Sequence, residues 1–458
     1  MARYRVQNPA TGRVVETFDA DSDERIDRAI TDADTAYREW RQRSIQERAG
    51  IVRRVAELFT ERKTGLARII TEEMGKPLGE AVEEVEFAAS IIDYYAVYGP
   101  SLATDVEIPS TVPGKAVIER RPVGPLLGVM PWNFPYYQVA RFAAPNLVLG
   151  NTVLLKHADI CPRSSQAIQA IMEEAGVPAG AYTNLYATHD QIATIIADPR
   201  VQGVSLTGSE RAGAIIGEQA GRHLKKAVLE LGGNDPMVVL SADDVAAVAK
   251  DGWDFRVYNG GQVCNSNKRM IVMDDIYDEF VAELAALADG LVPGDPLDMP
   301  ERSYGPLSSR AAAEQVDEQV RRAVAEGATL VAGGVLADDD SAYFSPAVLT
   351  GVSRESSIFG EEIFGPVAVV VTVSSDEEAL EVANDTAFGL GGCVFAADEA
   401  RAVAVASRLE VGMTHVNIVA AEAAELPFGG VKRSGFGREM GPLGMDEFVN
   451  KRFFFVAK

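Results

Sequence analysis

Cys264 lies in the segment Asn-Gly-Gly-Gln-Val-Cys-Asn at 259–265, where the residue types suit nucleophilic chemistry. Two adjacent glycines weaken a helix or strand, so we predict a loop or an element end that a ligand can approach closely. A partly exposed thiol with backbone N–H groups nearby can become a thiolate nucleophile. The alternative is an inert small residue beside a turn, which is the usual state of a lone cysteine. Other segments must decide between the two.

Asn133 stands between two prolines in Pro131-Trp132-Asn133-Phe134-Pro135, directly after an apolar run. The prolines restrict the backbone around a carboxamide that can donate hydrogen bonds. A donor held in this way suits an oxyanion hole, which stabilises the negative oxygen of a tetrahedral intermediate. The alternative is an ordinary turn.

Two further segments follow short apolar runs. Thr207-Gly208-Ser209 precedes a helical pattern, and the free N–H groups of a helix N-terminus favour an anion such as phosphate. Ser209 as a plain helix cap explains the same residues. Glu230 precedes Gly232 and Gly233, and a glutamate in an apolar pocket near a nucleophile can act as a general base. A solvated strand end is the simpler alternative for it.

The composition excludes several classes of function. The 458 residues carry 43 Lys+Arg against 67 Asp+Glu, a formal net charge of −24, which disfavours nucleic acid and anionic membrane as partners. Three cysteines and four histidines lie far apart, with no spacing typical of a disulfide framework or a zinc site, so we expect no metal and a cytoplasmic location. The N-terminus lacks the apolar core of a signal peptide, and no apolar run is long enough to span a membrane.

The periodicity predicts an α/β protein. Helical patterns occupy 23–75 and 78–98, and a β-hairpin at 101–122 leaves the domain as a candidate oligomerisation arm or an ordinary surface hairpin. From residue 124 short apolar runs alternate with helical stretches, which indicates βαβ units and a doubly wound parallel sheet of the kind that binds dinucleotides. A second α/β region follows residue 233, and the aromatic tail at 448–456 predicts a final strand.

Seven motifs, in order along nearly the whole chain, resemble those of the aldehyde dehydrogenase superfamily. They are PWNFP (131–135), LLKH (154–157), LTGS with a following glycine (206–213), ELGG (230–233), GQVC (261–264), EIFGP (362–366) and PFGGVKRSGFGRE (427–439). The LLKHA sequence and the chain length are most similar to the succinate-semialdehyde dehydrogenase branch. The resemblance implies a Rossmann-type cofactor domain, an α/β catalytic domain and a small β oligomerisation arm. We assign the cofactor domain to 1–103 and 123–232, the catalytic domain to 233–440, and the oligomerisation segments to 104–122 and 441–458.

The resemblance also implies roles for individual residues. Cys264 would attack the aldehyde, Asn133 and the Cys264 N–H would hold the oxyanion, and Glu230 would activate water. The residues implied to contact the cofactor are Trp132, Lys156, Asp159, Thr207, Gly208, Ser209, Leu231, Glu362 and Phe364. Glu439 stands where some members have a proton-relay carboxylate, but Phe142 replaces the relay lysine.

The cofactor is expected to be NAD or NADP. Asp159 can accept hydrogen bonds from ribose hydroxyls and would repel a 2′-phosphate, which favours NAD. The alternative is that Asp159 only caps a helix that begins near Arg163.

The expected substrate is a small aldehyde, first succinate semialdehyde, with another small aliphatic or aromatic aldehyde as the alternative. Arg141 is the candidate for binding a substrate carboxylate, and Arg256 is a weaker one, because Tyr258 stands where the branch often has a second arginine. Glu422 and Glu425, in the loop before PFGG, disfavour an anionic substrate unless they point away.

Two other classes stay open: a CoA-acylating relative, which Glu230 argues against, and a non-catalytic member that keeps the fold, which intact Cys264, Glu230 and Asn133 argue against. We expect a homodimer or homotetramer.

Overall fold

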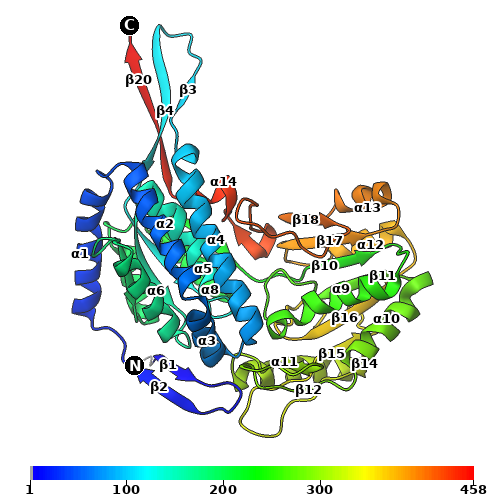
Figure 1. Ribbon diagram of the computed structural model, residues 1–458. Helices are drawn as coiled ribbons and strands as arrows, with labels where there is room; N and C mark the ends of the chain where they lie inside the picture. Colours follow the sequence, from blue (N-terminus) through cyan, green and yellow to red (C-terminus); the bar gives the residue numbers. More distant parts are fainter. Residues whose placement is uncertain (1–3) are drawn as a thin grey trace.

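A computed structural model describes residues 4–458 and confirms the α/β class (Figure 1). One six-stranded sheet has the order β19-β9-β8-β5-β6-β7, and all neighbours are parallel except β19 with β9. Its strands are β5 (Pro125–Met130), β6 (Thr152–His157), β7 (Tyr182–Leu185), β8 (Gly203–Thr207), β9 (Lys226–Glu230) and β19 (Gly435–Phe436). The chain builds β5, β6 and β7 in one direction and then returns to place β8 on the other side of β5. The carboxyl ends of β5 and β8 therefore form a topological switch point, where such sheets bind ligands.

Helices cover both faces of this sheet because adjacent strand residues point to opposite sides. Leu126 and Leu155 pack in the apolar core formed with α2 to α6, whereas Leu127 and Leu154 pack in the core formed with α1, α7 and α8. The helices are α1 (Asp23–Trp40), α2 (Ile45–Glu61), α3 (Lys63–Met74), α4 (Leu78–Leu102), α5 (Tyr137–Leu149), α6 (Pro162–Glu174), α7 (His189–Ala197) and α8 (Glu210–Arg222).

The second sheet has seven strands in the order β14-β15-β16-β11-β10-β17-β18, with only β14 antiparallel to its neighbour. The strands are β10 (Pro236–Val239), β11 (Arg269–Met273), β14 (Thr329–Ala332), β15 (Ala347–Thr350), β16 (Val367–Val373), β17 (Gly391–Phe395) and β18 (Met413–Val416). Its helices are α9 (Val245–Val257), α10 (Asp274–Ala288), α11 (Arg310–Ala325), α12 (Asp376–Asn384) and α13 (Glu399–Ala406). The predicted boundary at 440 falls after the chain has already returned to the first sheet through β19.

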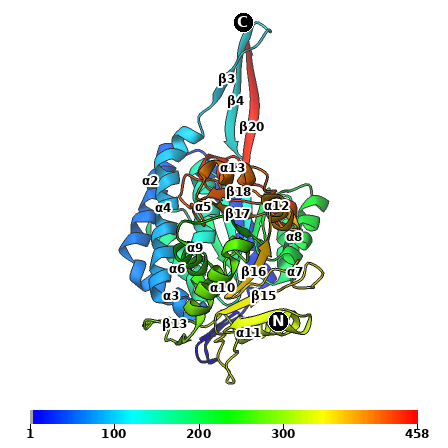
Figure 2. The same cartoon turned by 90° about the vertical axis from the view of Figure 1, so that its right-hand side faces the viewer.

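A three-stranded antiparallel sheet projects from the body of the molecule and carries the C-terminus near its tip (Figures 1 and 2). It joins β3 (Val106–Ile108) and β4 (Gly114–Pro122) to β20 (Val449–Ala457), so the predicted hairpin and tail strand belong to one element. Exposed apolar side chains on it include Val106, Phe453, Phe454 and Val456.

The remaining elements are short. They are β1 (Tyr4–Gln7), β2 (Val14–Phe18), β12 (Val292–Pro293), β13 (Ser303–Tyr304), α14 (Gly441–Gly444) and the 3₁₀ turns η1 (Tyr258–Gly261) and η2 (Lys432–Ser434). In the part of the chain that the structure describes, no helix combines the length and the apolar character that crossing a membrane requires.

Candidate active site

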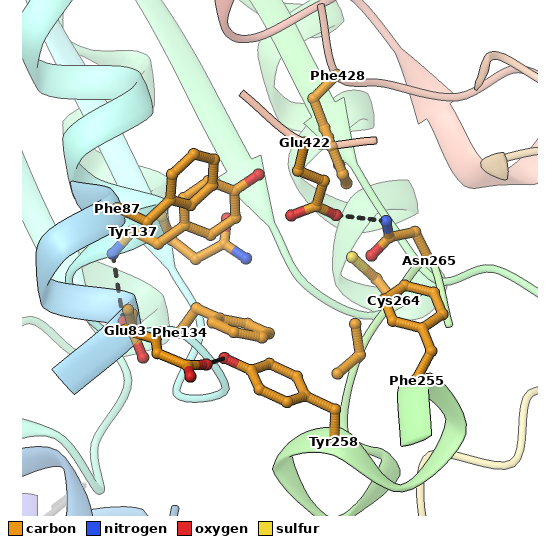
Figure 3. Close-up of a pocket in the computed structure, with 13 residues that line it drawn as sticks. Glu83, Phe87, Phe134, Tyr137, Phe255, Tyr258, Cys264, Asn265, Glu422 and Phe428 are labelled. Atoms are coloured by element: carbon orange, nitrogen blue, oxygen red, sulfur yellow. Dashed lines mark hydrogen bonds between the residues drawn. The ribbon is translucent and has the colours of Figure 1, made fainter. Parts of the chain in front are cut away.

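Cys264 lines a cavity of about 250 Å³ (Figure 3). Six lining residues are aromatic: Phe87, Phe134, Tyr137, Phe255, Tyr258 and Phe428. They come from α4, from the PWNFP segment and α5, from α9 and η1, and from the segment after β18, so both sheets contribute to the wall. The cavity is therefore apolar on most sides, with polar groups at a few positions.

The backbone before Cys264 has the tight geometry that the glycine pair predicts. Gly260 and Gly261 have φ of +62° and +71°, and a Cβ on Gly261 would collide with the Gly365 carbonyl of the EIFGP segment. Only glycine fits the backbone at Gly261, and the close approach fixes the loop that leads into the nucleophile. Cys264 itself is partly exposed to the cavity.

The surroundings of the Cys264 thiol disfavour the thiolate on balance. Burial raises its pKa to about 12, and the positive charges of Arg141 and Lys268 oppose that shift only in part. Cys161 and Cys393 are buried, and burial raises the pKa of each thiol as well. Cys264 alone of the three lines the cavity, which favours the nucleophile over the inert alternative.

Asn133 lies against the segment that carries Cys264. Its Nδ2 donates to the Gln262 carbonyl at 3.0 Å, two residues before the nucleophile. Asn259 Nδ2 in turn donates to the Asn133 carbonyl at 2.9 Å, and the Asn259 N–H donates to Glu80 Oε2 at 2.7 Å. Glu80 on α4 therefore holds the position of Asn133 through Asn259, a link that no sequence signal indicates.

Glu230 is buried, and neither of its carboxylate oxygens has a hydrogen-bond partner among the described residues. Burial raises its pKa well above the usual range, with Arg141 opposing the shift and Glu439 adding to it. A Cβ on Gly429 of the PFGG segment would lie 2.7 Å from Glu230 Oε1. Glu230 does not line the cavity at Cys264.

Lys268 joins three of the predicted motifs. Its Nζ donates to the Val263 and Cys264 carbonyls at 2.9 and 2.6 Å and pairs with Glu362 at 3.3 Å. Glu362 Oε1 also accepts from the Gly233 N–H at 3.0 Å. The GQVC, EIFGP and ELGG segments thus meet at one buried ammonium group, which sequence reasoning missed because Lys268 lies outside every motif.

The predicted cofactor residues gather at the carboxyl edge of the first sheet. Trp132 follows β5, Lys156 lies near the end of β6, and Ser209 follows β8 and caps α8 by accepting from Ala212 N at 3.3 Å. Leu231 follows β9 and packs against Gly213 of α8. The 13-residue helix α8 begins at the switch point, so its first N–H groups suit a pyrophosphate.

Two details of this edge differ from the sequence expectation. The Gly208 N–H already donates to the Glu230 carbonyl at 2.9 Å, because the pairing of β8 and β9 continues past Thr207. Cys161, not Asp159, precedes α6, so the cap alternative for Asp159 is wrong. Asp159 instead pairs with Lys156 Nζ at 3.1 Å and keeps an exposed side chain.

Phe364 packs edge-on against Trp132, with ring centroids 5.7 Å apart.

Arg256 lies outside the cavity lining, and its contacts argue against the expected substrate role. Its fully buried guanidinium donates to the carbonyls of Val367, Gly261, Ile363 and Gly365 and to Ser266 Oγ. Through these hydrogen bonds the Arg256 guanidinium joins α9 to the strand β16 and to the EIFGP segment.

Arg141 also lies outside the cavity lining. It forms a buried ion pair with Glu439 and donates to Thr207 Oγ1 and to the Tyr137 hydroxyl, each at 3.1 Å. Its guanidinium lies behind two residues that do line the cavity, 4.9 Å from the ring centroid of Tyr137 and 4.6 Å from that of Phe428. Arg141 thus stands behind the cavity wall and is paired with Glu439, which argues against the expected direct contact with a substrate carboxylate.

Three polar side chains of the cavity wall were not predicted as site residues. Gln138 is fully buried, lines the cavity, and has no hydrogen-bond partner in the described chain for either Nε2 or Oε1. Glu422 points into the cavity and accepts from Asn265 Nδ2 at 2.7 Å, whereas Glu425 does not line it. Glu83, on α4, accepts from the Tyr258 hydroxyl at 3.4 Å. The position of Gln138 five residues after Asn133, on a helix entering the site, is the signal that would have revealed it.

Among residues 4–458 no group of three or more His, Cys, Asp or Glu side chains is arranged to hold a metal ion. The groups available for chemistry at the site are the Cys264 thiol, the Asn133 amide and the buried carboxyl groups of Glu230 and Glu439.

Comparison with known proteins agrees with these features. A sequence model of the aldehyde dehydrogenase family matches residues 2–454. Succinate-semialdehyde dehydrogenase [NADP(+)] of Deinococcus radiodurans is 53% identical over 450 residues, which cover 98% of this chain and 94% of that protein. Succinate semialdehyde dehydrogenase [NAD(P)+] Sad of Escherichia coli is 41% identical over 97% of this chain and 96% of its own length. The crystal structure of succinic semialdehyde dehydrogenase from Streptococcus pyogenes with NADP+ is 42% identical, covers 99% of this chain and 100% of that one, and superposes with a TM-score of 0.96.

The family match spans almost the whole chain, and the relatives have similar length and the same fold. The chain belongs to the aldehyde dehydrogenase family.

Proposed function

We propose that the protein oxidises small aldehydes, succinate semialdehyde first among them, through a covalent intermediate on Cys264. The observation that best supports this proposal is that Cys264 lines a cavity of about 250 Å³ in a chain of the aldehyde dehydrogenase family. The overall reaction converts an aldehyde, NAD(P)+ and water into a carboxylate, NAD(P)H and two protons. The cofactor is NAD(P), in agreement with the relatives.

In the first step Cys264 Sγ, as a thiolate, forms a bond to the aldehyde carbon and gives a thiohemiacetal. The carbonyl oxygen gains negative charge, which Asn133 Nδ2 and the Cys264 backbone N–H stabilise by donating hydrogen bonds. Because the free thiol has a raised pKa, the thiolate depends on positive charge near the sulfur, and Arg141 and Lys268 supply it. A dinucleotide held at the sheet edge would supply the hydride acceptor needed to oxidise the thiohemiacetal to a thioester.

Glu230 acts in the second half of the reaction. Its carboxylate removes a proton from the water that attacks the thioester, and Cys264 leaves as a thiolate. The absence of any hydrogen-bond partner for its two oxygens among residues 4–458 leaves both free to bind that water. A base for water favours release of a free acid over transfer of the acyl group to CoA.

The residues at the sheet edge fit a dinucleotide, because a helix N-terminus, a lysine and a carboxylate converge there. Ser209 and the first turn of α8 would hold the pyrophosphate, Lys156 and Asp159 the adenine-side ribose, and Glu362 the nicotinamide ribose. Trp132, Thr207, Gly208, Leu231 and Phe364 would complete the walls. Asp159 favours NAD because its carboxylate repels a 2′-phosphate, whereas the Deinococcus radiodurans relative is named for NADP+, the Streptococcus pyogenes structure holds NADP+, and the Escherichia coli relative is named for NAD(P)+. We propose that Asp159 sets the ratio between the two.

The relatives support succinate semialdehyde as the substrate. Its carboxylate would bind at the Tyr137 hydroxyl, which Arg141 polarises, and at the Gln138 amide, which has no partner in the described chain. The only group to which the Tyr137 hydroxyl donates in the structure is Met440 Sδ, at 3.3 Å, and a thioether is a weak acceptor.

The first test follows the absorbance of the reduced nicotinamide with succinate semialdehyde, butanal and benzaldehyde, with NAD and with NADP. Each assay is repeated with CoA. Reduction without CoA and release of the free acid support the proposal. A strict requirement for CoA, or no reduction with any aldehyde, would overturn it.

We further propose that the segments 1–103 and 123–232 bind the cofactor and that 233–440 supplies the nucleophile. The arm formed by 104–122 and 441–458 would join protomers into a homodimer or homotetramer, since its exposed aromatic side chains suit burial against another copy. Three free cysteines are consistent with a cytoplasmic location.

A further inference from the structure

The charged residues that line the cavity in the described chain are all acidic. Three of its lining residues, Glu83, Glu84 and Glu422, are acidic, and no Lys, Arg or His from residues 4–458 lines it. Glu84 is neutralised, because it pairs with buried Lys76 and accepts from the Tyr136 and Tyr137 N–H groups. Glu83 and Glu422 have no cationic partner within ion-pair distance in the described chain and accept only from neutral groups. Two carboxylates without an ion-pair partner in the described chain therefore face this cavity. Burial raises the pKa of Glu422, and the hydrogen bond from Asn265 and the more distant charge of Arg141 offset part of that rise.

These carboxylates flank the space beside the nucleophile. Glu422 accepts from the side chain of Asn265, the residue after Cys264, and Figure 3 shows its carboxylate directed into the cavity. Glu83 lies on the other side of the space, beside Tyr258 (Figure 3). A ligand that reaches Cys264 must pass within the field of both groups.

Gln138 gives an independent sign of a polar ligand. Its side chain is fully buried and lines the cavity, yet neither Nε2 nor Oε1 has a partner in the described chain. Leaving a buried amide unpaired costs free energy, so such groups usually have a partner. Its Oε1 can accept a hydrogen bond from an ammonium group as readily as its Nε2 can donate to a carboxylate.

The aromatic wall suits a cation as well. Lys76 Nζ already lies 3.6 Å from the centroid of the Phe134 ring, and Phe134 packs on Tyr258 with ring centroids 6.3 Å apart. Aromatic faces attract ammonium groups, and the attraction is stronger where water is excluded. Carboxylates, an amide oxygen and aromatic faces together form a recognition surface for an alkylammonium group.

We propose that this cavity admits a second substrate class, short aldehydes that carry a protonated amine, and that Glu422 is the main residue selecting them. The reaction is the one already described: Cys264 bonds to the aldehyde carbon, hydride passes to NAD(P)+, and water releases the acid. An ω-amino aldehyde thus gives an ω-amino acid, NAD(P)H and two protons. This inference rests on the proposed role of Cys264 and goes beyond the substrate proposed above.

The test compares two aldehydes of the same length, 3-aminopropanal and butanal, at pH 7, where the amine is protonated. With the wild-type protein we expect kcat/KM for 3-aminopropanal to exceed that for butanal by about tenfold, the size of one partly shielded charge contact. High salt should reduce this advantage, because screening weakens the attraction.

Glu422→Gln keeps the shape of the side chain and removes its charge. It should lose most of the tenfold advantage for 3-aminopropanal, change butanal by less than about twofold, and raise kcat/KM for succinate semialdehyde by removing a like charge. Glu425→Gln is the matched control, because Glu425 lies in the same loop but does not line the cavity, and it should behave like the wild type. Glu83→Gln should produce a smaller loss than Glu422→Gln, because Glu422 is held by Asn265, the residue next to Cys264, whereas Glu83 is held by Tyr258.

Two results would overturn the inference: butanal used as well as 3-aminopropanal by the wild type, or equal losses for both aldehydes in Glu422→Gln. If succinate semialdehyde is still oxidised in that case, the proposed function stands and only the second substrate class fails. If no aldehyde reduces NAD(P)+, the proposed function itself fails.

Discussion

Arg141 and Glu439 form an ion pair that is closed to solvent, and it lies directly behind Tyr137 of the cavity wall. The arginine that was expected to hold a substrate carboxylate is thus engaged with a carboxylate of the protein itself. Ser205 Oγ donates to the same glutamate at 3.1 Å, which ties the pair to β8. The pair links the end of the last of the seven motifs, PFGGVKRSGFGRE, to α5 and the first sheet.

Removing one partner of this pair should destabilise the protein. Arg141→Met leaves Glu439 buried without a cation, and we expect the free energy of unfolding, measured by urea titration, to fall by about 3–5 kcal/mol. The double variant Arg141→Met/Glu439→Gln should recover much of that loss, since it leaves no uncompensated charge. A single variant as stable as the wild type would contradict the buried pair.

Gln138 should discriminate polar from apolar aldehydes. Gln138→Met keeps the approximate volume but removes both hydrogen-bonding groups, so kcat/KM for succinate semialdehyde should fall by about five- to tenfold. Butanal should be oxidised as well as before or better, because the variant removes an unsatisfied buried amide. Equal changes for the two substrates would mean that Gln138 does not contact the ligand.

Glu230 should control the second half of the reaction. Glu230→Gln should give a normal first burst of reduced nicotinamide and then very slow turnover, because the thioester forms before the base is needed. In the wild type the base works only when ionised, and burial raises its pKa, so kcat should rise with pH through a range above that of an exposed glutamate. That acidic limb should disappear in the variant. Loss of the burst together with turnover would place Glu230 earlier in the reaction.

Asp159 should set the choice between the two dinucleotides. Asp159→Ser removes the carboxylate that we propose faces the ribose, and it frees Lys156 from its 3.1 Å ion pair. Both changes favour a 2′-phosphate, so the ratio of kcat/KM for NADP to that for NAD should rise by about tenfold. Arg163→Gln, in the first turn of α6, serves as the control for a nearby loss of charge. An unchanged ratio in Asp159→Ser would show that the Lys156 pair is only structural.

The fold was predictable from the sequence where apolar patterns are long. The alternation of runs at 126–130, 152–155 and 204–206 with helical stretches predicts the parallel sheet, and the aromatic tail predicts the strand β20. The bounds of short helices such as α7, with nine residues, were not predicted, because their apolar pattern is short. The return of residues 435–436 to the first sheet was also missed, because a two-residue strand has no periodicity of its own.

The candidate site was predictable only as far as its motifs reach. Cys264, Asn133 and Glu230 lie in recognisable segments, and the structure brings all three segments together. The partners of individual side chains were not predictable, because pairs such as Lys268 with Glu362 or Arg141 with Glu439 are separated by many residues along the chain. Arg256 illustrates the limit: nothing in its sequence context distinguishes an arginine that binds substrate from one that binds five buried acceptors.

The central claim is that the aldehyde becomes bonded to the sulfur of Cys264, and trapping the acyl enzyme tests it most directly. Glu230→Gln should be mixed with succinate semialdehyde and NAD or NADP, quenched in acid during the slow phase, digested and analysed by mass spectrometry. We predict that the peptide containing Cys264 gains the mass of one succinyl group, and that Cys264→Ala in the same background gains none. An adduct on Cys161 or Cys393, or full turnover by the Cys264→Ala single variant, would contradict the account.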